Sequence, residues 1–339
     1  MRHKFLATLA YSTGVPKVRH LSFIARGVPP RQSCDMATAR DPEPSFARDL
    51  AEARTHRAPI ADPELGLALA LGGGFSRGFA HLGILQVLEQ ENVPISVIVG
   101  TSIGALLGAA YADGVAVRDL CDLGRRVRVR DFLRFRQSGQ STERKDRISQ
   151  FVEEWLCAAN VEELRIPTAI VTTDLNTAAP YVFTSGPLAV ALRASCAFPG
   201  LVKPVEFDGR MLADGCIAAP VPTATAARIN GGCVLGVSVG SNLASASPSE
   251  NIVKVLDREF RSSHRIALEP SWSRHADILL EPQVHHIDWN DFSRVDEAFS
   301  AGVEAAHLAL PAIRELLDRR FQQGRAAGMR LRAEKALSL

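Results

Sequence analysis

The sequence predicts an α/β fold with a mostly parallel central sheet and helices on both faces. Between residues 65 and 239, short runs rich in Val, Ile and Leu alternate with longer runs that have apolar residues at helical spacing. This alternation favours parallel strands joined by helical connections. The chain has 339 residues, of which 46% are hydrophobic and 22% charged, and this composition is typical of globular proteins.

Each element follows from its own pattern. The expected strands are residues 67–71, 95–99, 168–173, 181–184, 205–212 and 233–239. The expected helices are residues 82–90, 103–113, 147–159, 187–196 and 222–229. Within the fifth strand segment, the turn pair Asp208-Gly209 predicts a hairpin. Residues 291–320 are expected to form a long amphipathic helical region that is interrupted near Pro311.

A serine stands at the junction between the second predicted strand and the helix that follows it. The run Gly100-Thr101-Ser102-Ile103-Gly104 matches the nucleophile-elbow pattern Gly-x-Ser-x-Gly. The sharp turn lifts the serine hydroxyl out of the sheet, and the two glycines let strand and helix approach closely. The helix N-terminus also brings free N–H groups to the reacting centre. The pattern predicts that Ser102 attacks a carbonyl; a purely structural turn is the alternative.

A second strand, loop and helix precede this elbow. Residues 67–71 lead into Gly72-Gly73-Gly74-Phe75-Ser76-Arg77-Gly78. Backbone N–H groups of such a loop can converge on an anion, and beside a nucleophilic serine they suit an oxyanion hole. Nucleotide binding is an alternative, but the loop has neither the Gly-x-Gly-x-x-Gly spacing nor a Gly-Lys-Ser/Thr end. A purely structural glycine loop is another alternative.

Downstream of the predicted hairpin, Asp214-Gly215 is followed by small residues and prolines. This position suits a carboxylate that reaches into a site, although turn chemistry alone also explains an Asp-Gly pair. Asp208 is assigned to the hairpin turn itself.

Taken in this order, the three segments resemble the patatin-like phospholipase family. The family pattern is a G-G-G-x-R/K-G loop, a G-x-S-x-G elbow and a distant D-G-G or D-G-A, matched here by residues 72–78, 100–104 and 214–216. Residues 193–200 and 220–222 look like the short bacterial members. The resemblance covers residues 65–320 and implies a three-layer sandwich.

The resemblance also implies a reaction. The family uses a Ser–Asp dyad, so Ser102 is the expected nucleophile and Asp214 the general base in hydrolysis of lipid carboxylic esters through an acyl-enzyme. Phospholipase A, lysophospholipase and esterase activities all fit, with no cofactor or metal. Arg77 is expected to shape the loop or to face an anionic head group. The expected oxyanion and substrate-binding residues are Gly73, Gly74, Phe75, Arg77 and Gly78.

Two positions depart from the family pattern. Phe75 stands where the family has the third glycine of the loop, and Cys216 stands where it has Gly or Ala. An oxyanion role for Phe75 requires that this residue adopt the backbone angles of the glycine in the family pattern. Cys216 is still small and leaves the Asp-Gly pair intact.

Other readings of the site remain open. In a classical Ser–His–Asp triad, a histidine after Asp214 completes the order of an α/β-hydrolase, but no His-Gly-Gly-Gly segment accompanies it. The candidates for that histidine are His264, His275, His285 and His286. The adjacent pair at 285–286 is also a weak metal candidate. His81 is expected to pack or cap a helix. A catalytically silent member of the fold, acting through binding, is a further alternative.

The rest of the sequence bears on the domain organisation of the protein and on its location in the cell. Residues 1–62 are expected to be a disordered or loosely ordered extension, 63–322 the acyl hydrolase domain and 323–339 a tail. Six cysteines without regular spacing and the lack of a long apolar run favour a cytoplasmic protein. Six arginines between Arg125 and Arg136, interleaved with Val, Phe and Leu, suit either peripheral membrane contact or a solvated helix face. Nucleic-acid binding is not expected.

Overall fold

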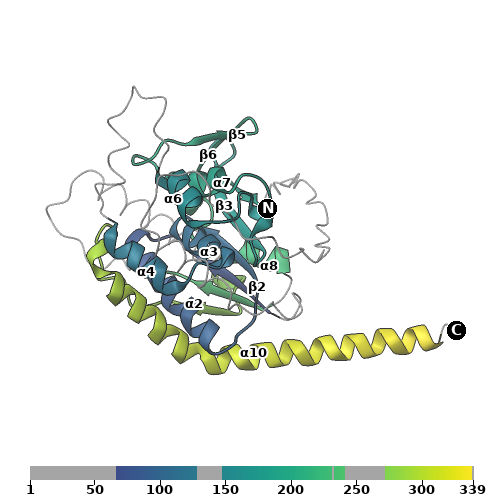
Figure 1. Cartoon of the computed structure of the whole chain (residues 1–339). Helices are drawn as coiled ribbons and strands as arrows, with labels where there is room; N and C mark the ends of the chain where they lie inside the picture. The colour runs from purple at the N-terminus through teal and green to yellow at the C-terminus, as the bar shows by residue number, and fades with distance from the viewer. Residues whose placement is uncertain (1–65, 128–146, 231–232, 241–271, 338–339) are drawn as a thin grey trace, which may run out of the picture. The chain divides into compact units, whose positions relative to one another are not determined.

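The computed structural model describes residues 66–127, 147–230, 233–240 and 272–337. These residues form an eight-stranded sheet of order β5-β6-β3-β2-β1-β7-β8, with β4 paired to β3 (Figure 1). The strands are β1 Leu67–Leu71, β2 Ile95–Thr101, β3 Thr168–Asp174, β4 Ala179–Phe183, β5 Val205–Phe207, β6 Arg210–Asp214, β7 Val234–Val237 and β8 Ile278–Leu280.

Five strands are parallel and three are antiparallel. β3, β2, β1, β7 and β8 run parallel to their neighbours, whereas β4 and β6 run antiparallel to β3, and β5 runs antiparallel to β6. The predicted α/β class with a mostly parallel sheet is therefore confirmed. The antiparallel hairpin matters for the site because it returns the chain to the end of β3.

The described helices are η2 Phe75–Phe79, α2 Ala80–Gln90, α3 Ile103–Asp113, α4 Val117–Arg126, α6 Arg147–Trp155, η4 Val161–Glu163, α7 Leu188–Ser195, η5 Gly215–Ile217, α8 Thr223–Asn230, η6 Phe292–Arg294 and α10 Val295–Leu337. The helix α3 has the predicted bounds, residues 103–113. The strand β8 and the helix α4 were not predicted, because three residues and a strongly charged segment carry little periodic signal.

The sheet has a core on each face, which gives the three layers. Strand side chains alternate between faces: Leu67, Leu69 and Leu71 of β1 belong to the larger core with α2, α3 and α10. Ala68 and Ala70 point the other way, to a smaller core that includes Ala226 of α8. Small side chains on that face let α8 lie close to the sheet.

The expected interruption near Pro311 is wrong, since α10 runs through this residue from Val295 to Leu337. Proline removes one backbone donor, but α10 is held by packing against α2 (Figure 1). The contact is close, because a Cβ on Gly83 would meet Phe299 O and one on Gly302 would meet Ala80 O. Burial of one helix face outweighs the loss of a single hydrogen bond.

Several predictions concern residues outside the described ranges. These are the extension at 1–62, the arginine-rich segment from 128 to 136, and His264.

Candidate active site

The turn between β2 and α3 places Ser102. Its φ is 55° and its ψ is −124°, in a region that L-residues rarely occupy, and such strain is concentrated at functional sites. The flanking glycines are required by space. A Cβ on Gly104 would meet the carbonyl oxygens of Leu71 and Gly72, and one on Gly100 would meet the backbone of Ala105. At the predicted elbow, neighbouring backbone segments therefore lie too close together for a side chain at either glycine.

A second serine supports the elbow. The backbone N–H of Ser102 donates to Ser195 Oγ at 2.8 Å, and Ser195 Oγ donates to Val171 O at 2.7 Å. Ser195 is fully buried at the end of α7. No local pattern predicted a role for this residue, although it lies in the segment 193–200 that carried the family resemblance.

The Ser102 hydroxyl donates to Asp214 Oδ2 at 2.7 Å. Asp214 ends β6, where the antiparallel register sets it opposite Thr172 of β3. Its other carboxylate oxygen, Oδ1, accepts the Cys216 N–H at 2.9 Å, and its carbonyl accepts Thr173 Oγ1 at 2.9 Å. The two residues paired by sequence reasoning are thus in direct contact.

The electrostatics of Asp214 follow from its burial. The side chain has no exposed surface, and this desolvation raises the pKa of the carboxyl to about 6, partly opposed by the hydrogen bonds from Cys216 and Ser102. The carboxylate is still the main form at neutral pH, yet it is a stronger base than an ordinary aspartate.

The glycine loop is held by backbone hydrogen bonds to distant segments. The N–H of Gly72 donates to Val237 O at 3.0 Å and the N–H of Gly73 to Pro220 O at 3.1 Å. His81 Nε2 is 2.8 Å from Gly72 O. The peptide between Gly72 and Gly73 is therefore anchored at both ends. Because the Gly73 N–H is engaged, Gly74 and Phe75 are left as the predicted oxyanion donors.

The second half of the loop contacts the chain just before η6. Ser76 N–H donates to Trp289 O at 3.1 Å, and Arg77 Nε donates to Ile287 O at 2.6 Å. Arg77 is only 6% exposed, and its side chain links the loop to the segment before η6. Gly78 packs on α3, where a Cβ would meet the Ile103 side chain.

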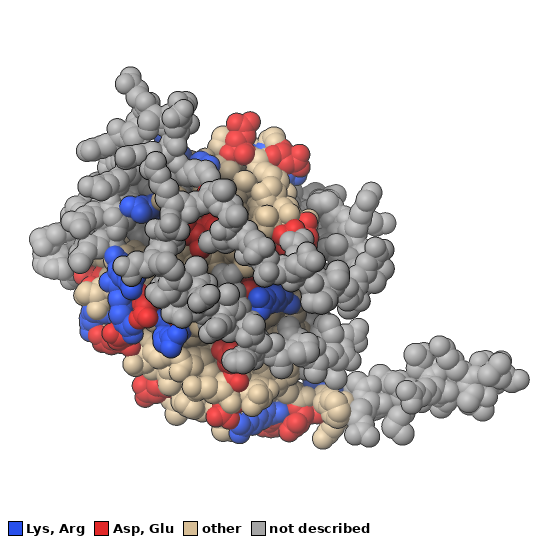
Figure 2. Space-filling model, in the orientation of Figure 1, with Lys and Arg blue, Asp and Glu red and all other residues tan. Residues whose placement is uncertain are grey.

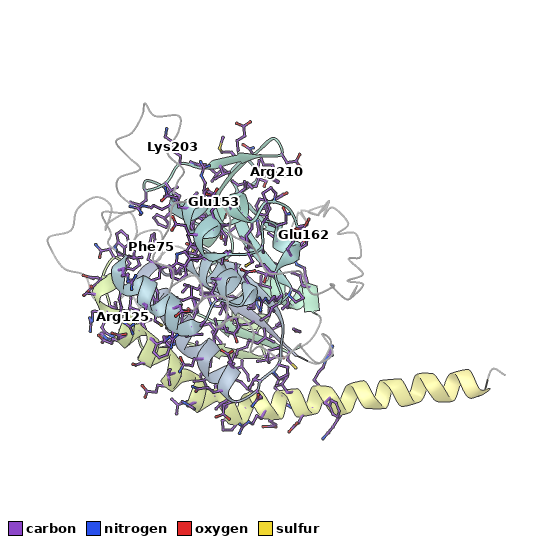
Figure 3. All side chains as sticks on the ribbon, in the orientation of Figure 1. Phe75, Arg125, Glu153, Glu162, Lys203 and Arg210 are labelled. Atoms are coloured by element: carbon purple, nitrogen blue, oxygen red, sulfur yellow. The ribbon has the colours of Figure 1, made fainter. Side chains whose placement is uncertain are left out.

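Phe75 (labelled in Figure 3) adopts a φ of 51°. This is the left-handed φ that a glycine takes without strain, so the phenylalanine holds a conformation that suits glycine. Its ring lies against Phe198 and Trp289. The segment around Trp289 was not predicted to belong to the site, because it is far from the motifs in the chain.

Three histidines of the described residues, His81, His285 and His286, have contacts of their own. Burial lowers the pKa of His81 to about 4, so the ring is neutral and orients the loop. His286 Nε2 contacts Glu297 Oε1 at 2.5 Å on the surface, and the ring of His285 lies beside that of His286. Asp214 instead bonds Ser102 and Cys216.

Within the described ranges, no cluster of three or more His, Cys, Asp or Glu side chains suits a metal ion. In that part of the chain, every helix is too short or too polar to span a membrane.

Comparison with known proteins identifies relatives. The family model for patatin-like phospholipases matches residues 69–227. An uncharacterized NTE family protein of Mycobacterium tuberculosis is 36% identical over 203 residues, which cover 58% of this chain and 56% of that protein. A protein of Mycosarcoma maydis named "Lysophospholipase NTE1" is 30% identical over 183 residues, 52% of this chain and 10% of its own length.

A mouse protein named "Patatin-like phospholipase domain-containing protein 6" is 30% identical over 186 residues, 52% of this chain and 14% of its own. The chain thus spans a little over half the length of the mycobacterial relative and a small part of the others. A solved structure, VipD from Legionella pneumophila, is similar with a TM-score of 0.42 and 14% identity over 77% of this chain and 68% of that one. The family resemblance inferred from the three motifs is confirmed.

Proposed function

Since residues 69–227 form a patatin-like phospholipase domain, we propose that this chain is a serine lipid acyl hydrolase with a Ser102–Asp214 dyad. The observation that carries the proposal is the 2.7 Å hydrogen bond from the hydroxyl of Ser102, at a strained elbow, to a fully buried carboxylate. Nucleophile and base within hydrogen-bond reach are the signature of covalent catalysis.

The reaction has two halves. As Ser102 Oγ attacks the ester carbonyl, Asp214 takes its proton; collapse of the tetrahedral intermediate releases the alcohol, which receives that proton. Water then gives a proton to Asp214 and attacks the acyl-enzyme, and Ser102 leaves with the proton from Asp214 while the free acid is released. In both halves, the oxyanion donors that we propose are the backbone N–H groups of Gly74 and Phe75, at about 3 kcal/mol per donor.

The buried carboxylate suits this role. A pKa of about 6 instead of 3.8 makes Asp214 a stronger base by about 3 kcal/mol. Protonation below pH 6 removes the base, so kcat/KM is expected to rise with pH through about 6 and then to level off.

The substrate class rests on the family. The relatives include proteins named as lysophospholipases, so phospholipids and lysophospholipids are the substrates that we propose to test. Peripheral membrane contact through residues 125–136 is a further part of the proposal. Arg125 itself is paired with Asp122 and Asp296, so the contact depends on the arginines that follow it. Figure 2 shows basic side chains interspersed with acidic ones on the visible described surface.

The decisive experiment compares hydrolysis of a medium-chain p-nitrophenyl ester and of lysophosphatidylcholine micelles by wild type and variants. We expect Ser102→Ala and Asp214→Asn to lower kcat by about three orders of magnitude or more. Asp208→Asn is the matched control, because Asp208 lies at the exposed turn of the same hairpin.

A double variant, His285→Ala with His286→Ala, tests the triad alternative. Full activity in that variant supports the dyad, and a loss as large as that of Ser102→Ala, in folded protein, contradicts it. An inactive wild type that also fails to react with a fluorophosphonate probe would instead favour a regulatory protein of this fold.

A further inference from the structure

Phe75 is a bulky residue in a backbone conformation that favours glycine. Its φ of 51° lies in the left-handed region, where a residue with a large side chain is strained and persists only when its surroundings hold it. Glycine would satisfy the same backbone without strain. The side chain itself must therefore contribute something at this position.

The ring of Phe75 joins two aromatic side chains from distant segments. Its centroid is 5.4 Å from that of Phe198, after α7, and 4.9 Å from that of Trp289, before η6. Both contacts are edge-to-face, the arrangement that aromatic pairs favour. All three residues are only partly buried, so this aromatic cluster presents apolar surface to the outside of the core.

The aromatic cluster borders the nucleophile. Phe75 directly follows Gly74, and on the adjacent Gly73 a Cβ would lie 3.2 Å from Ser102 Cβ. Phe198 is two residues after Cys196, whose side chain lies beside those of Ser102 and Asp214. Two of the three rings are thus attached to segments that touch the reacting serine.

We propose that Phe75, Phe198 and Trp289 form the surface that binds the acyl chain of the substrate, which we call the acyl seat. The inference rests on the proposed function and deepens it, because it predicts a preference for esters of medium or long chain acids. In an acyl-enzyme the carbonyl carbon is bonded to Ser102 and its oxygen points to the glycine loop. The chain then extends past the residues that flank this loop, and three uncharged rings suit methylene groups.

The charges nearby argue against the head group in the same place. Asp288, next to Trp289, is exposed and acidic, which disfavours a phosphate. The guanidinium of Arg77 is buried and bonded to Ile287 O. The apolar part of the lipid is therefore the occupant that this surface fits.

A binding experiment tests the seat without catalysis. In Ser102→Ala protein, 9,10-dibromostearate should quench tryptophan fluorescence, whereas unbrominated stearate should not, because bromine quenches only at contact distance. Trp289→Phe should remove most of the quenching. Trp155→Phe is the matched control, since Trp155 stacks on Phe151 in α6, and it should leave the quenching in place. Quenching that survives Trp289→Phe but disappears with Trp155→Phe overturns the proposal.

A kinetic experiment tests the seat during turnover. The measured quantity is the ratio of kcat/KM for p-nitrophenyl octanoate to that for the acetate. We expect Phe198→Ala and Trp289→Leu to lower this ratio on the order of tenfold, the discrimination that an apolar pocket gives for one or two methylenes. Phe207→Leu, in the separate aromatic group with Tyr181 and Phe183, should leave the ratio unchanged.

The two proposals fail in different ways. If wild type hydrolyses both esters but the ratio is the same in Phe198→Ala, Trp289→Leu and Phe207→Leu, the acyl seat is wrong and the dyad stands. If neither ester is hydrolysed while dibromostearate quenches Trp289, the hydrolase proposal is wrong and the seat for an acyl chain stands.

Discussion

The glycine loop after β1 and the serine elbow after β2 are neighbouring versions of the same unit, and they differ in how the chain turns. β1 and β2 are parallel and paired from Ala68 to Leu71, and each leads into a helix. The first turn is spread over Gly72 to Phe79, whereas the second is completed at one strained residue, Ser102. The first arrangement binds its N–H groups at Gly72, Gly73 and Ser76 to distant carbonyls, and the second presents a single side chain to Asp214.

The two turns are also anchored differently. The elbow is closed by direct backbone packing and by the buried hydroxyl of Ser195. The loop depends on hydrogen bonds to segments far along the chain, at Pro220, Ile287 and Trp289. We infer that the elbow is the more rigid of the two turns. Substitutions of glycine should therefore have different consequences in the elbow and in the loop.

The largest effect is expected from Gly104→Ala. The added methyl meets the carbonyl oxygens of Leu71 and Gly72, which belong to backbone and cannot rotate away. We expect a loss of about 1–3 kcal/mol in the free energy of unfolding and loss of fluorophosphonate labelling at Ser102. Chemical denaturation and labelling measure these effects. Wild-type labelling in this variant would show that the elbow tolerates expansion.

The next largest effect is expected at Asp214, the buried carboxylate that accepts the hydrogen bond from Ser102. Because the pKa of Asp214 is about 6 when folded and near 3.8 when unfolded, the folded protein binds this proton more tightly. Its stabilising contribution is fully present below pH 4 and is lost as the pH rises through 6. Asp214→Asn does not titrate, so its free energy of unfolding relative to wild type should increase between pH 4 and 6 by up to about 3 kcal/mol.

Denaturation of both proteins at a series of pH values measures this difference. A difference independent of pH would mean that Asp214 is not desolvated. Wild-type activity should rise over the same pH range in which the variant gains stability relative to wild type, as expected if the ionised base is held at the expense of folding stability.

At the glycine loop, the effect of a similar substitution should be rescued by a second one. In Gly73→Ala the methyl meets the Cys216 thiol, a side chain that can be shortened. We expect kcat to fall about tenfold or more, a loss of at least 1.4 kcal/mol in transition-state stabilisation. Adding Cys216→Ala should restore most of it in a double-mutant cycle. The same second substitution should not rescue Gly104→Ala, and equal behaviour of the two pairs would contradict the distinction between loop and elbow.

A smaller effect is expected from Ser195→Ala. The buried N–H of Ser102 loses its acceptor, which costs about 1–3 kcal/mol, shared between stability and positioning of the nucleophile. We expect a lower kcat with little change in KM. Ser195→Thr keeps the hydroxyl and should retain more activity than Ser195→Ala; the reverse order would make the role of Ser195 one of packing alone.

Local chemistry explains what could be predicted. Residues 103–113 form a helix with the predicted bounds because the Gly-x-Ser-x-Gly turn marks its start and Gly114, with a φ of 100°, marks its end. The interruption expected at Pro311 is wrong because packing of α10 against α2 depends on residues far apart in the sequence. Gly73 was expected to face the oxyanion, but its N–H is taken by Pro220.

The sequence by itself determined the α/β class, the turn at Ser102 and the glycine loop, because short motifs and side-chain periodicity encode strands, helices and turns. The choice of Asp214 as the partner of Ser102 came from the family resemblance of the three motifs taken together. Only the tertiary structure decided three contacts. Ser195 accepts the N–H of Ser102, and Arg77 donates to Ile287 O. The ring of Phe75 contacts those of Phe198 and Trp289. These contacts join segments from 93 to more than 200 residues apart. Their geometry arises from how the layers pack, which no local pattern records.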